Sequence, residues 1–275
     1  MEYLQSLFSL RDKTAVITGG GGVLGSALAL ALARAGARVV VISLHAQSAQ
    51  KVAEAIQAEG QQALALACDV TDRAALAEAY QLIKKTFGPT DILVNGAGGN
   101  RPQATASPAQ PFFQLDPEAL EQAYKLNFMG TLLPCQIFGQ GMVERDQGCI
   151  INISSMAALR TITNVVAYSA AKSAVTNFTR WLAVHMAQQY SPNIRVNALA
   201  PGFFLTEQNR FLLTNEHDGS YTPRGLAILA HTPARRLGVP EDLVSTLLWL
   251  VSPASSFVTG VVVPVDGGFS IFSGV

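Results

Sequence analysis

Residues 14–26 read Thr-Ala-Val-Ile-Thr-Gly-Gly-Gly-Gly-Val-Leu-Gly-Ser and join two different local patterns. The run Thr14–Thr18 is apolar or β-branched at nearly every position, which predicts a buried strand. After the glycines, small and apolar residues predict a helix over Val23–Ala35. A strand that leads through glycines into a helix is the context that a dinucleotide-binding turn requires.

The glycines of this turn allow a phosphate group to come close to the backbone. Gly20, Gly22 and Gly25 have the spacing G-x-G-x-x-G, which lets a pyrophosphate lie at the positive end of the following helix. The turn therefore predicts a dinucleotide site. The alternative is a flexible turn that binds nothing.

The rest of the chain alternates strand-like apolar runs with helical patterns. Further strands are predicted at Arg38–Ser43, Gln62–Cys68, Ile92–Asn95, Cys149–Ser154, Ile194–Ala198 and Val261–Pro264, and helices at Ala49–Glu59, Arg73–Phe87, Pro117–Glu144, Ala167–Gln189 and Glu241–Val251. Strands that are apolar on both faces and alternate with helices imply a parallel sheet covered on both sides. We therefore predict a single α/β domain over residues 1–275, with a doubly wound parallel sheet of about seven strands and helices on both faces.

Two stretches do not fit this alternation. Residues 99–115 are rich in Pro, Ala and Gln over 101–114, and residues 203–236 are long and mixed in character. Both follow strands on the side of the sheet where ligands of open α/β folds bind. Long loops in compact domains are usually functional or disordered. We predict that both stretches form the wall and lid of a substrate pocket, rather than idle loops.

Composition argues against several kinds of partner. Only 14% of the residues are charged, and Lys plus Arg equal Asp plus Glu at 19 each. A net charge of zero gives no steering toward nucleic acid or an anionic membrane. No apolar run reaches the roughly 20 residues of a membrane-spanning helix, and Met1–Leu10 lack a signal pattern. We expect a soluble cytoplasmic protein with no nucleic-acid and no membrane partner.

The end of the second predicted strand carries no acid. Dinucleotide enzymes that prefer NAD place an acidic residue there to hold the adenosine ribose, whereas this chain has Ser43 and His45. A carboxylate would repel a 2′-phosphate and these side chains would not. We predict NAD(H) or NADP(H) as cofactor, with tolerance of NADP(H). Asp69 is either an acceptor for the adenine amino group or the N-cap of the next helix.

Tyr168 and Lys172 lie four residues apart in a predicted helix, which places both side chains on one face. A lysine ammonium beside a phenol favours the phenolate, and would lower the pKa of Tyr168 from its ordinary value of about 10. Such a phenol can donate and accept a proton near neutral pH. The alternative is that the pair merely decorates a helix.

Taken together, these residues resemble the short-chain dehydrogenase/reductase family over essentially the whole chain. The resembling motifs are the glycine turn at 18–25, Asn95-Gly96-Ala97-Gly98, Asn127, Ser155 thirteen residues before Tyr168, and Pro201-Gly202 with Thr206. One position departs from the family pattern, because Val23 stands where the middle glycine of the turn is expected. Gly22 is then expected to let the pyrophosphate approach.

The resemblance implies a Rossmann-type fold and reversible hydride transfer between a nicotinamide and a carbonyl/alcohol pair. It gives Tyr168 the role of proton donor, Ser155 a hydrogen bond to the substrate oxygen, and Asn127 a water chain to solvent. It makes Lys172 the support of the phenolate and the anchor of the nicotinamide ribose. With the glycine turn, it implies a cofactor site formed by Gly19, Gly20, Gly22, Leu24, Gly25, Ser43, His45, Asp69, Val70, Asn95, Ala97, Gly98, Tyr168, Lys172, Pro201, Gly202, Phe204 and Thr206.

Several segments are similar to the D-mannonate oxidoreductase, or fructuronate reductase, subgroup of this family. They are residues 95–100, Pro201–Arg210, His231–Pro233 and residues 267–275, while Arg101 stands where His is expected. The similarity implies a D-fructuronate/D-mannonate pair. Other substrates, such as 5-ketogluconate, stay open as an alternative. A remote alternative of another class is a nucleotide-sensing protein without turnover.

A sugar-acid substrate needs a planar cation for its carboxylate and polar groups for its hydroxyls. Asn100, Arg101 and Arg210 are the preferred substrate residues, with the two arginines as carboxylate clamps. A solvated or ion-paired arginine is the alternative for each. Other candidates around the pocket mouth are Arg160, Gln208 and Asn209.

No metal site is expected, because His217 and His231 lack partners at a metal-binding spacing. The cysteines Cys68, Cys135 and Cys149 are scattered, and we expect them to be small buried side chains. The apolar segment Phe269–Val275 would form an adhesive patch if it were exposed. We therefore expect it at a subunit interface of a homotetramer, since family members commonly form tetramers.

Overall fold

Seven parallel strands form one sheet in the computed structural model, which describes residues 2–206, 210–215 and 218–274. The sheet order is β3-β2-β1-β4-β5-β6-β7. The strands are β1 (Thr14–Thr18), β2 (Arg38–Ser43), β3 (Ala63–Ala67), β4 (Ile92–Asn95), β5 (Gly148–Ile153), β6 (Ile194–Pro201) and β7 (Val262–Val265). Strand order reverses direction between β1 and β4, which is the doubly wound arrangement. The predicted fold class is confirmed.

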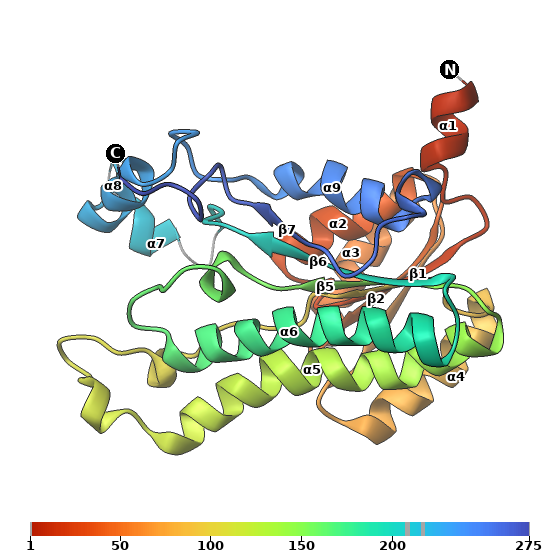
Figure 1. Cartoon of the computed structure of the whole chain (residues 1–275), viewed down its shortest axis with the longest axis horizontal. Coiled ribbons are helices and arrows are strands. Elements are labelled where there is room, and N and C mark those ends of the chain that lie inside the picture. The colour runs from red at the N-terminus through yellow and green to blue at the C-terminus, as the bar shows by residue number, and fades with distance from the viewer. Residues whose placement is uncertain (1, 207–209, 216–217, 275) are drawn as a thin grey trace.

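Helices lie on both sides of this sheet (Figure 1). They are α1 (Glu2–Phe8), α2 (Val23–Arg34), α3 (Ala46–Ala58), α4 (Arg73–Phe87), α5 (Pro117–Glu144), α6 (Val166–Gln189), α7 (Arg210–Leu213), α8 (Pro223–Ala230) and α9 (Val244–Val251). Short 3₁₀ turns occur at Pro102–Ala104, Phe112–Gln114, Met156–Ala158, Pro240–Leu243 and Pro253–Ser255.

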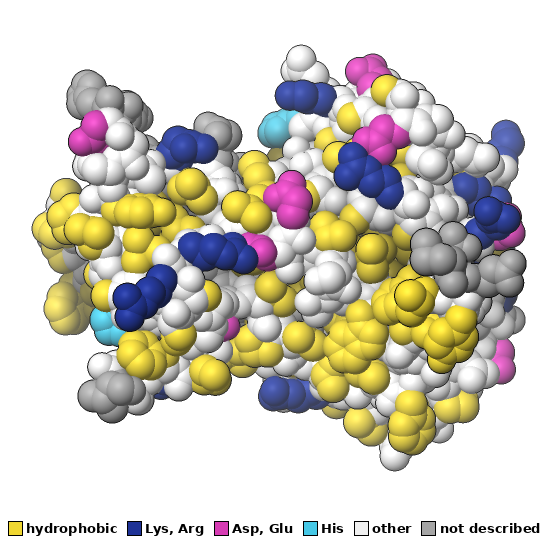
Figure 2. Space-filling view, turned by 90° about the horizontal axis from the view of Figure 1, so that it is seen from above, with side chains coloured by type: hydrophobic (Ala, Val, Ile, Leu, Met, Phe, Trp, Pro, Cys, Tyr) yellow, Lys and Arg dark blue, Asp and Glu magenta, His cyan; other side chains and the backbone are white. Residues whose placement is uncertain are grey.

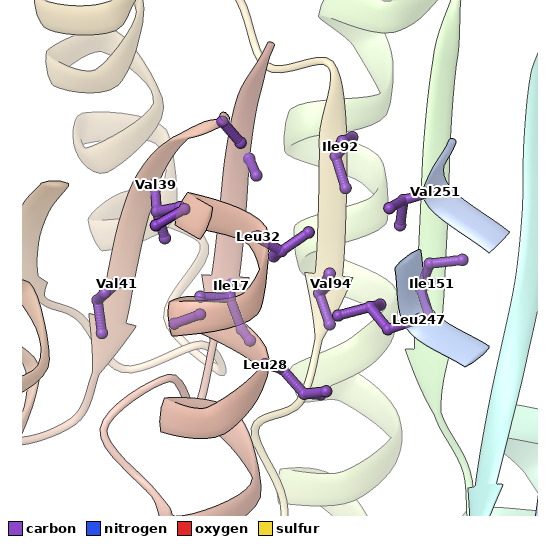
Figure 3. Packing of buried hydrophobic residues seen from close by; sticks show 14 of the residues in the cluster. Ile17, Leu28, Leu32, Val39, Val41, Ile92, Val94, Ile151, Leu247 and Val251 are labelled. Carbon is purple, nitrogen blue, oxygen red and sulfur yellow. The ribbon is translucent and has the colours of Figure 1, made fainter. Parts of the chain in front are cut away.

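The two faces of the sheet are buried by different helices because successive strand residues point to opposite sides. Ile17 packs with Leu28 of α2 and Leu247 of α9 on one face (Figure 3). Its neighbour Val16 belongs to the other core, which includes Phe138 of α5 and residues of α4 and α6. Both faces of the sheet are therefore shielded from water by helices. This explains why successive strand residues are all apolar and do not alternate with polar ones.

Helix starts follow local capping chemistry. The Asp72 carboxylate accepts hydrogen bonds from the backbone N–H groups of Ala74 and Ala75 and caps α4. The N-cap alternative for Asp69 is therefore wrong. Asp116 caps α5 in the same way by accepting from the N–H of Glu118, and Pro117 occupies the first helical position.

The sequence prediction differs from the structure mainly outside the apolar periodic segments. Helix α1 was not predicted, because seven residues are too few to show a clear periodicity. Predicted lid residues 203–236 contain α7 and α8, and residues 99–115 contain two 3₁₀ turns. These elements lie at the end of the molecule where α7 and α8 are labelled in Figure 1, beyond the carboxyl ends of β5 and β6.

Surface charge agrees with the neutral composition. Figure 2 shows positive and negative side chains interspersed on one face, with hydrophobic side chains gathered toward the two ends. Within the described residues, no helix combines the length and the apolar character needed to cross a bilayer.

Candidate active site

The glycine turn between β1 and α2 is formed by close backbone contacts. Gly19 has a φ of 66°, which favours glycine, and a Cβ there would lie 2.6 Å from the carbonyl oxygen of Gly96. A Cβ at Gly25 would overlap the carbonyl oxygen of Gly19. These contacts hold the turn against the end of β4, so the start of α2 faces the carboxyl edge of the sheet.

The start of α2 is left open for an anion. Gly22 is the N-cap and has no side-chain capping bond, so the first N–H groups of α2 lack a side-chain partner among the described residues. A Cβ at Gly22 would approach only the carbonyl oxygen of Gly19, at 3.3 Å. Val23, which stands where the family has the middle glycine of the turn, is the first residue of α2. The open surface lies one position earlier, at Gly22. An uncapped helix start beside an open glycine fits a pyrophosphate.

The end of β2 presents hydroxyl groups instead of a carboxylate. Ser43 Oγ and Ser48 Oγ lie 2.9 Å apart, and Ser48 Oγ donates to the carbonyl oxygen of His45. A Cβ at Gly21 would meet both hydroxyls within 2.9 Å. Sequence reasoning missed Ser48, although its place in the first turn of α3, three residues after His45, could have indicated this contact.

The third strand leads to an exposed Asp69. Its Oδ1 accepts from both the backbone N–H and the hydroxyl of Thr71, each at 2.8 Å. These bonds fix the carboxylate through Oδ1, and Oδ2 has no hydrogen-bond partner among the described residues.

Several predicted cofactor residues have side chains that pack inside the protein. Asn95 donates from Nδ2 to Asn152 Oδ1 inside the core, Val70 packs on Gly130, and Phe204 packs on Gly238. Thr18 was not assigned a role from sequence, but its Oγ1 accepts from the N–H groups of Gly96 and Ala97 and fixes that segment.

Two adjacent serines end β5 and point to different surroundings. The hydroxyl of Ser154 is buried and lies 2.6 Å from Thr176 Oγ1. Ser155 Oγ accepts from the backbone N–H of Ala157. Ser155 lies near enough to Tyr168 to act on its phenol, where it lowers the pKa. Ser154, by contrast, has its hydroxyl taken up in the core.

Lys172 lies under Tyr168, one helical turn further along α6. Its side chain is almost fully buried, and Nζ donates to the carbonyl oxygen of Ile153 at 2.8 Å. Nζ lies 5.7 Å from the centroid of the Tyr168 ring. The predicted common face is therefore confirmed, with the ammonium directed at the end of β5.

The predicted lowering of the pKa of Tyr168 by Lys172 is wrong. Burial raises the pKa of Tyr168, and Ser155 offsets only part of that rise. Burial also lowers the pKa of Lys172 to about 8. The phenol is accordingly protonated at neutral pH.

Asn127 locks the segment opposite Lys172. Its Nδ2 donates to the carbonyl oxygen of Gly99 at 2.7 Å, and its Oδ1 accepts from the Gly99 N–H at 3.1 Å. A Cβ at Gly98 would lie 2.6 Å from Asn127 Oδ1 and 3.2 Å from Lys172 Nζ. Glycine at 98 therefore lets helices α5 and α6 bring Asn127 and Lys172 to one point. Gly99 itself was not predicted as a partner.

The predicted substrate residues separate into groups with different contacts. Arg101 is exposed, and its guanidinium makes no hydrogen bond or ion pair with any described residue. Asn100 donates to Thr105 Oγ1, and Arg210 begins α7. Arg160 is already occupied, because it donates to two backbone carbonyls of the C-terminal segment. Gln208 and Asn209 lie outside the described residues.

The remaining sequence expectations concern metals and the C-terminal tail. Within the described part of the chain, no group of three or more His, Cys, Asp or Glu side chains is placed to hold a metal ion. His231 bonds to the carbonyl oxygen of Ala227, and His217 lies outside the described residues. All three cysteines are buried. Phe269 of the tail packs within the chain, against Phe203, whereas Ile271 is exposed.

A tyrosine, a buried lysine and a serine at the carboxyl edge of a doubly wound sheet, beside an open glycine turn, fit a dinucleotide-dependent oxidoreductase. Comparison with known proteins agrees. The sequence model of the family described as short chain dehydrogenase matches residues 13–217. The chain belongs to that family. It is an NAD(P)-dependent oxidoreductase that acts on CH–OH groups.

Individual relatives are similar over nearly their whole length. UxuB of Bacillus subtilis, an uncharacterised oxidoreductase, is 49% identical, with 97% of this chain and 98% of the relative covered. A candidate D-mannonate oxidoreductase of Haemophilus influenzae, solved with bound NAD, is 43% identical at a TM-score of 0.91, covering 97% and 98%. A gluconate 5-dehydrogenase of Burkholderia cenocepacia, solved with NADP and tartrate, is 32% identical at a TM-score of 0.87, covering 97% and 98%.

The buried charge of Lys172 predicts a pH-dependent stability. Its pKa is about 8 in the folded protein against an ordinary 10.5, so unfolding takes up a proton between these pH values. The cost of burying the ammonium is fully present below pH 8 and falls as the pH rises toward 10.5. The wild type should therefore gain stability as the pH rises, and Lys172→Met should not share this gain. We expect the free energy of unfolding of Lys172→Met, minus that of the wild type, to fall by up to about 3 kcal/mol over this range.

Urea unfolding at pH 7, 8, 9 and 10 measures this difference. Lys84→Met, which changes an exposed lysine of α4, serves as the control and should show a constant difference from the wild type. A constant difference for Lys172→Met as well would contradict a lowered pKa.

Proposed function

We propose that this protein is a cytoplasmic reductase and dehydrogenase of a sugar acid, interconverting D-fructuronate and D-mannonate. The observation that carries the catalytic part is that Tyr168 lies over the buried Lys172, whose Nζ is held by Ile153, with Ser155 acting on the same phenol. The similarity at 43% identity to a candidate D-mannonate oxidoreductase with bound NAD supports the substrate. Residues 1–275 would work as one catalytic unit, with residues 99–115 and 203–236 bounding the substrate.

A second candidate substrate is 5-ketogluconate. It is favoured by the 32% identity to a gluconate 5-dehydrogenase that was solved with tartrate, a small hydroxylated dicarboxylate. Both substrates are hydroxylated carboxylates with one ketone, so the same cation and the same catalytic groups could serve either.

The placement of Tyr168 and Ser155 supports acid catalysis by Tyr168. A ketone oxygen placed between the two hydroxyls would accept hydrogen bonds from Ser155 and from Tyr168. A nicotinamide, when bound, would supply hydride to the carbonyl carbon. As charge develops on the oxygen, Tyr168 transfers its phenolic proton to it, and the Ser155 hydroxyl holds the oxygen in place.

Lys172 and Asn127 complete this arrangement. After proton transfer, the Lys172 ammonium lies near enough to stabilise the phenolate by charge attraction. We assign the nicotinamide ribose to the same ammonium. The Asn127 side chain is bonded to Gly99 and Ala123, and it keeps α5 against the 95–99 segment. A proton path from Lys172 past Asn127 to solvent is part of this proposal.

The cofactor proposal is NAD(H) or NADP(H), with tolerance of the 2′-phosphate. Ser43 and Ser48 offer two hydroxyls where NAD-specific enzymes place a carboxylate, and the exposed His45 adjoins them. These groups can hydrogen-bond either a ribose hydroxyl or a phosphate. Relatives solved with NAD and with NADP support both.

Assembly into a homotetramer, with the C-terminal tail at an interface, is also proposed. The tail exposes 82% of Ile271, and α6 exposes about half of the surface of Trp181 and Val184. Apolar side chains of this size are unfavourable in water when they are not covered. Covering them by second copies of the chain would remove that cost.

Steady-state kinetics tests the function. We expect oxidation of NADH or NADPH, followed at 340 nm, with D-fructuronate or 5-ketogluconate, and a much lower rate with an aliphatic ketone. Tyr168→Phe should lower kcat by about 10²-fold or more, because positioned acid catalysis contributes that much. Cofactor binding should be nearly unchanged. A Phe variant that keeps most of its activity would show that Tyr168 is not the acid, and absence of turnover with every ketone would leave the nucleotide-sensing alternative.

Arg101 is the proposed clamp for the substrate carboxylate. Arg101→Met should raise KM for the sugar acid by about tenfold to a hundredfold, as expected for a lost charge-assisted hydrogen bond, with kcat little changed. Arg11→Met is the control, because Arg11 is exposed near the amino edge of the sheet and has no described side-chain partner. An unchanged KM would remove Arg101 from the clamp.

Light scattering at micromolar concentration tests the assembly. We expect the mass of a tetramer for the wild type and a smaller mass for Ile271→Asp, since a carboxylate in an apolar interface is costly. Phe113→Asp, which alters a similarly exposed side chain outside the tail, is the control. A monomeric wild type would refute the proposal.

A further inference from the structure

Arg160 holds the C-terminal segment by two hydrogen bonds. Its Nε donates to the carbonyl oxygen of Ser270 at 2.6 Å, and Nη2 donates to that of Phe272 at 3.2 Å. These residues are 110 and 112 positions away along the chain. A guanidinium that binds two carbonyls of one turn fixes both their distance and their orientation.

The C-terminal segment is itself a rigid turn. The Asp266 carboxylate accepts from the N–H groups of Gly268 and Ser270, and the N–H groups of Ile271 and Phe272 bond to the carbonyl oxygen of Gly268. We call residues 266–272 the C-terminal turn. Its start is attached to the sheet, because β7 ends at Val265.

The C-terminal turn also contacts the predicted lid. The ring of Phe269 meets that of Phe203 edge-on, with centroids 5.1 Å apart. The N–H of Ala234 donates to the carbonyl oxygen of Gly267, and a Cβ at Gly268 would lie 3.1 Å from the Pro233 ring. Phe269 belongs to the small apolar cluster under α7 and α8. The lid therefore rests on the C-terminal turn.

On its other side, Arg160 is part of the connection between β5 and α6, residues 154–165, which we call the catalytic segment. Its backbone N–H donates to the carbonyl oxygen of Met156, which begins the 3₁₀ turn that Ser155 caps. The backbone of Arg160 is thus bonded to Met156, the residue next to Ser155. The same guanidinium joins the segment that holds the substrate oxygen to the turn that supports the lid.

We propose that Arg160 is a positioning residue for the family reaction. It fastens the C-terminal turn to the catalytic segment and so keeps the lid at the distance from Ser155 that a bound substrate requires. Arg160 acts through Ser155 and the lid and does not itself touch the substrate. The proposal rests on the oxidoreductase activity of the family and holds for either sugar-acid ketone.

A double-mutant cycle tests this coupling. One variant is Arg160→Met, and the other ends the chain at Phe269, which removes both carbonyl acceptors but keeps the ring that packs on Phe203. Each should raise KM for the ketone about tenfold, a size expected for loss of hydrogen bonds to a charged group. Arg160→Met should have no further effect in the shortened chain, because the truncation has already removed both acceptors of Arg160. Multiplied effects would overturn the proposal.

Further readouts separate positioning from folding. The kcat value and the dissociation constant of NADH, measured by fluorescence, should change by less than about threefold if only the lid is released. Arg160→Lys, which keeps the charge but offers one donating nitrogen in place of two, should recover part of the lost affinity. Arg11→Met is again the control and should leave KM unchanged. A fall in cofactor affinity equal to the fall in ketone affinity would contradict a role confined to the lid.

Hydrogen exchange supplies a test that needs no substrate. In Arg160→Met, the amides of Leu205, of residues 226–232 and of Ala234 should exchange about tenfold faster than in the wild type, because their support is freed. Amides of β1 and β4 should not change. If turnover fails with every ketone but exchange rises in this pattern, the substrate assignment is wrong and the coupling stands. Unchanged exchange in the lid would refute the coupling.

Discussion

The site depends on one buried charge. Lys172 is almost completely removed from water, and a buried ammonium is costly unless it has a close polar partner. The carbonyl oxygen of Ile153 at the end of β5 provides that partner. This bond draws α6 against the edge of the sheet and sets the height of Tyr168, one turn earlier on the same helix face. It also places the phenol beside Ser155, which follows Ile153 by two residues.

Two neighbouring elements adapt to this bond. Gly98 has no side chain, so the amide of Asn127 on α5 can approach the ammonium from the opposite side. Reciprocal hydrogen bonds between Asn127 and Gly99 then fix the 95–99 segment, which Thr18 holds from the glycine turn. A chain of short contacts thus connects the glycine turn with Lys172 and Tyr168. The surroundings that position Tyr168 also shield it from water. They disfavour the charged phenolate and so raise the pKa of Tyr168.

The sequence was sufficient for features that depend on local periodicity or spacing. Buried strands such as Thr14–Thr18 follow from apolar runs, and the common face of Tyr168 and Lys172 follows from their four-residue spacing. It was not sufficient for features fixed by distant partners. The direction of the Lys172 ammonium depends on a carbonyl 19 residues away, and the occupation of Arg160 depends on a turn about 110 residues away. Composition and periodicity contain no signal for either contact. They also do not show how deeply Tyr168 is buried, and burial is what raises its pKa where a lowering was expected.

The same distinction bears on how the substrate is recognised. An arginine that satisfies carbonyls of its own chain cannot give those hydrogen bonds to a carboxylate without releasing the segment it holds. Arg160 is in that position, and using it as a clamp would loosen the turn beneath the lid. Arg101 lies on the loop after β4, where no described side chain competes for it, and the 99–115 loop is tied to the catalytic segment by the bond from Ala106 to Asn164. Within the proposed function, recognition of the substrate carboxylate is therefore best assigned to Arg101. Arg160 is needed to support the lid.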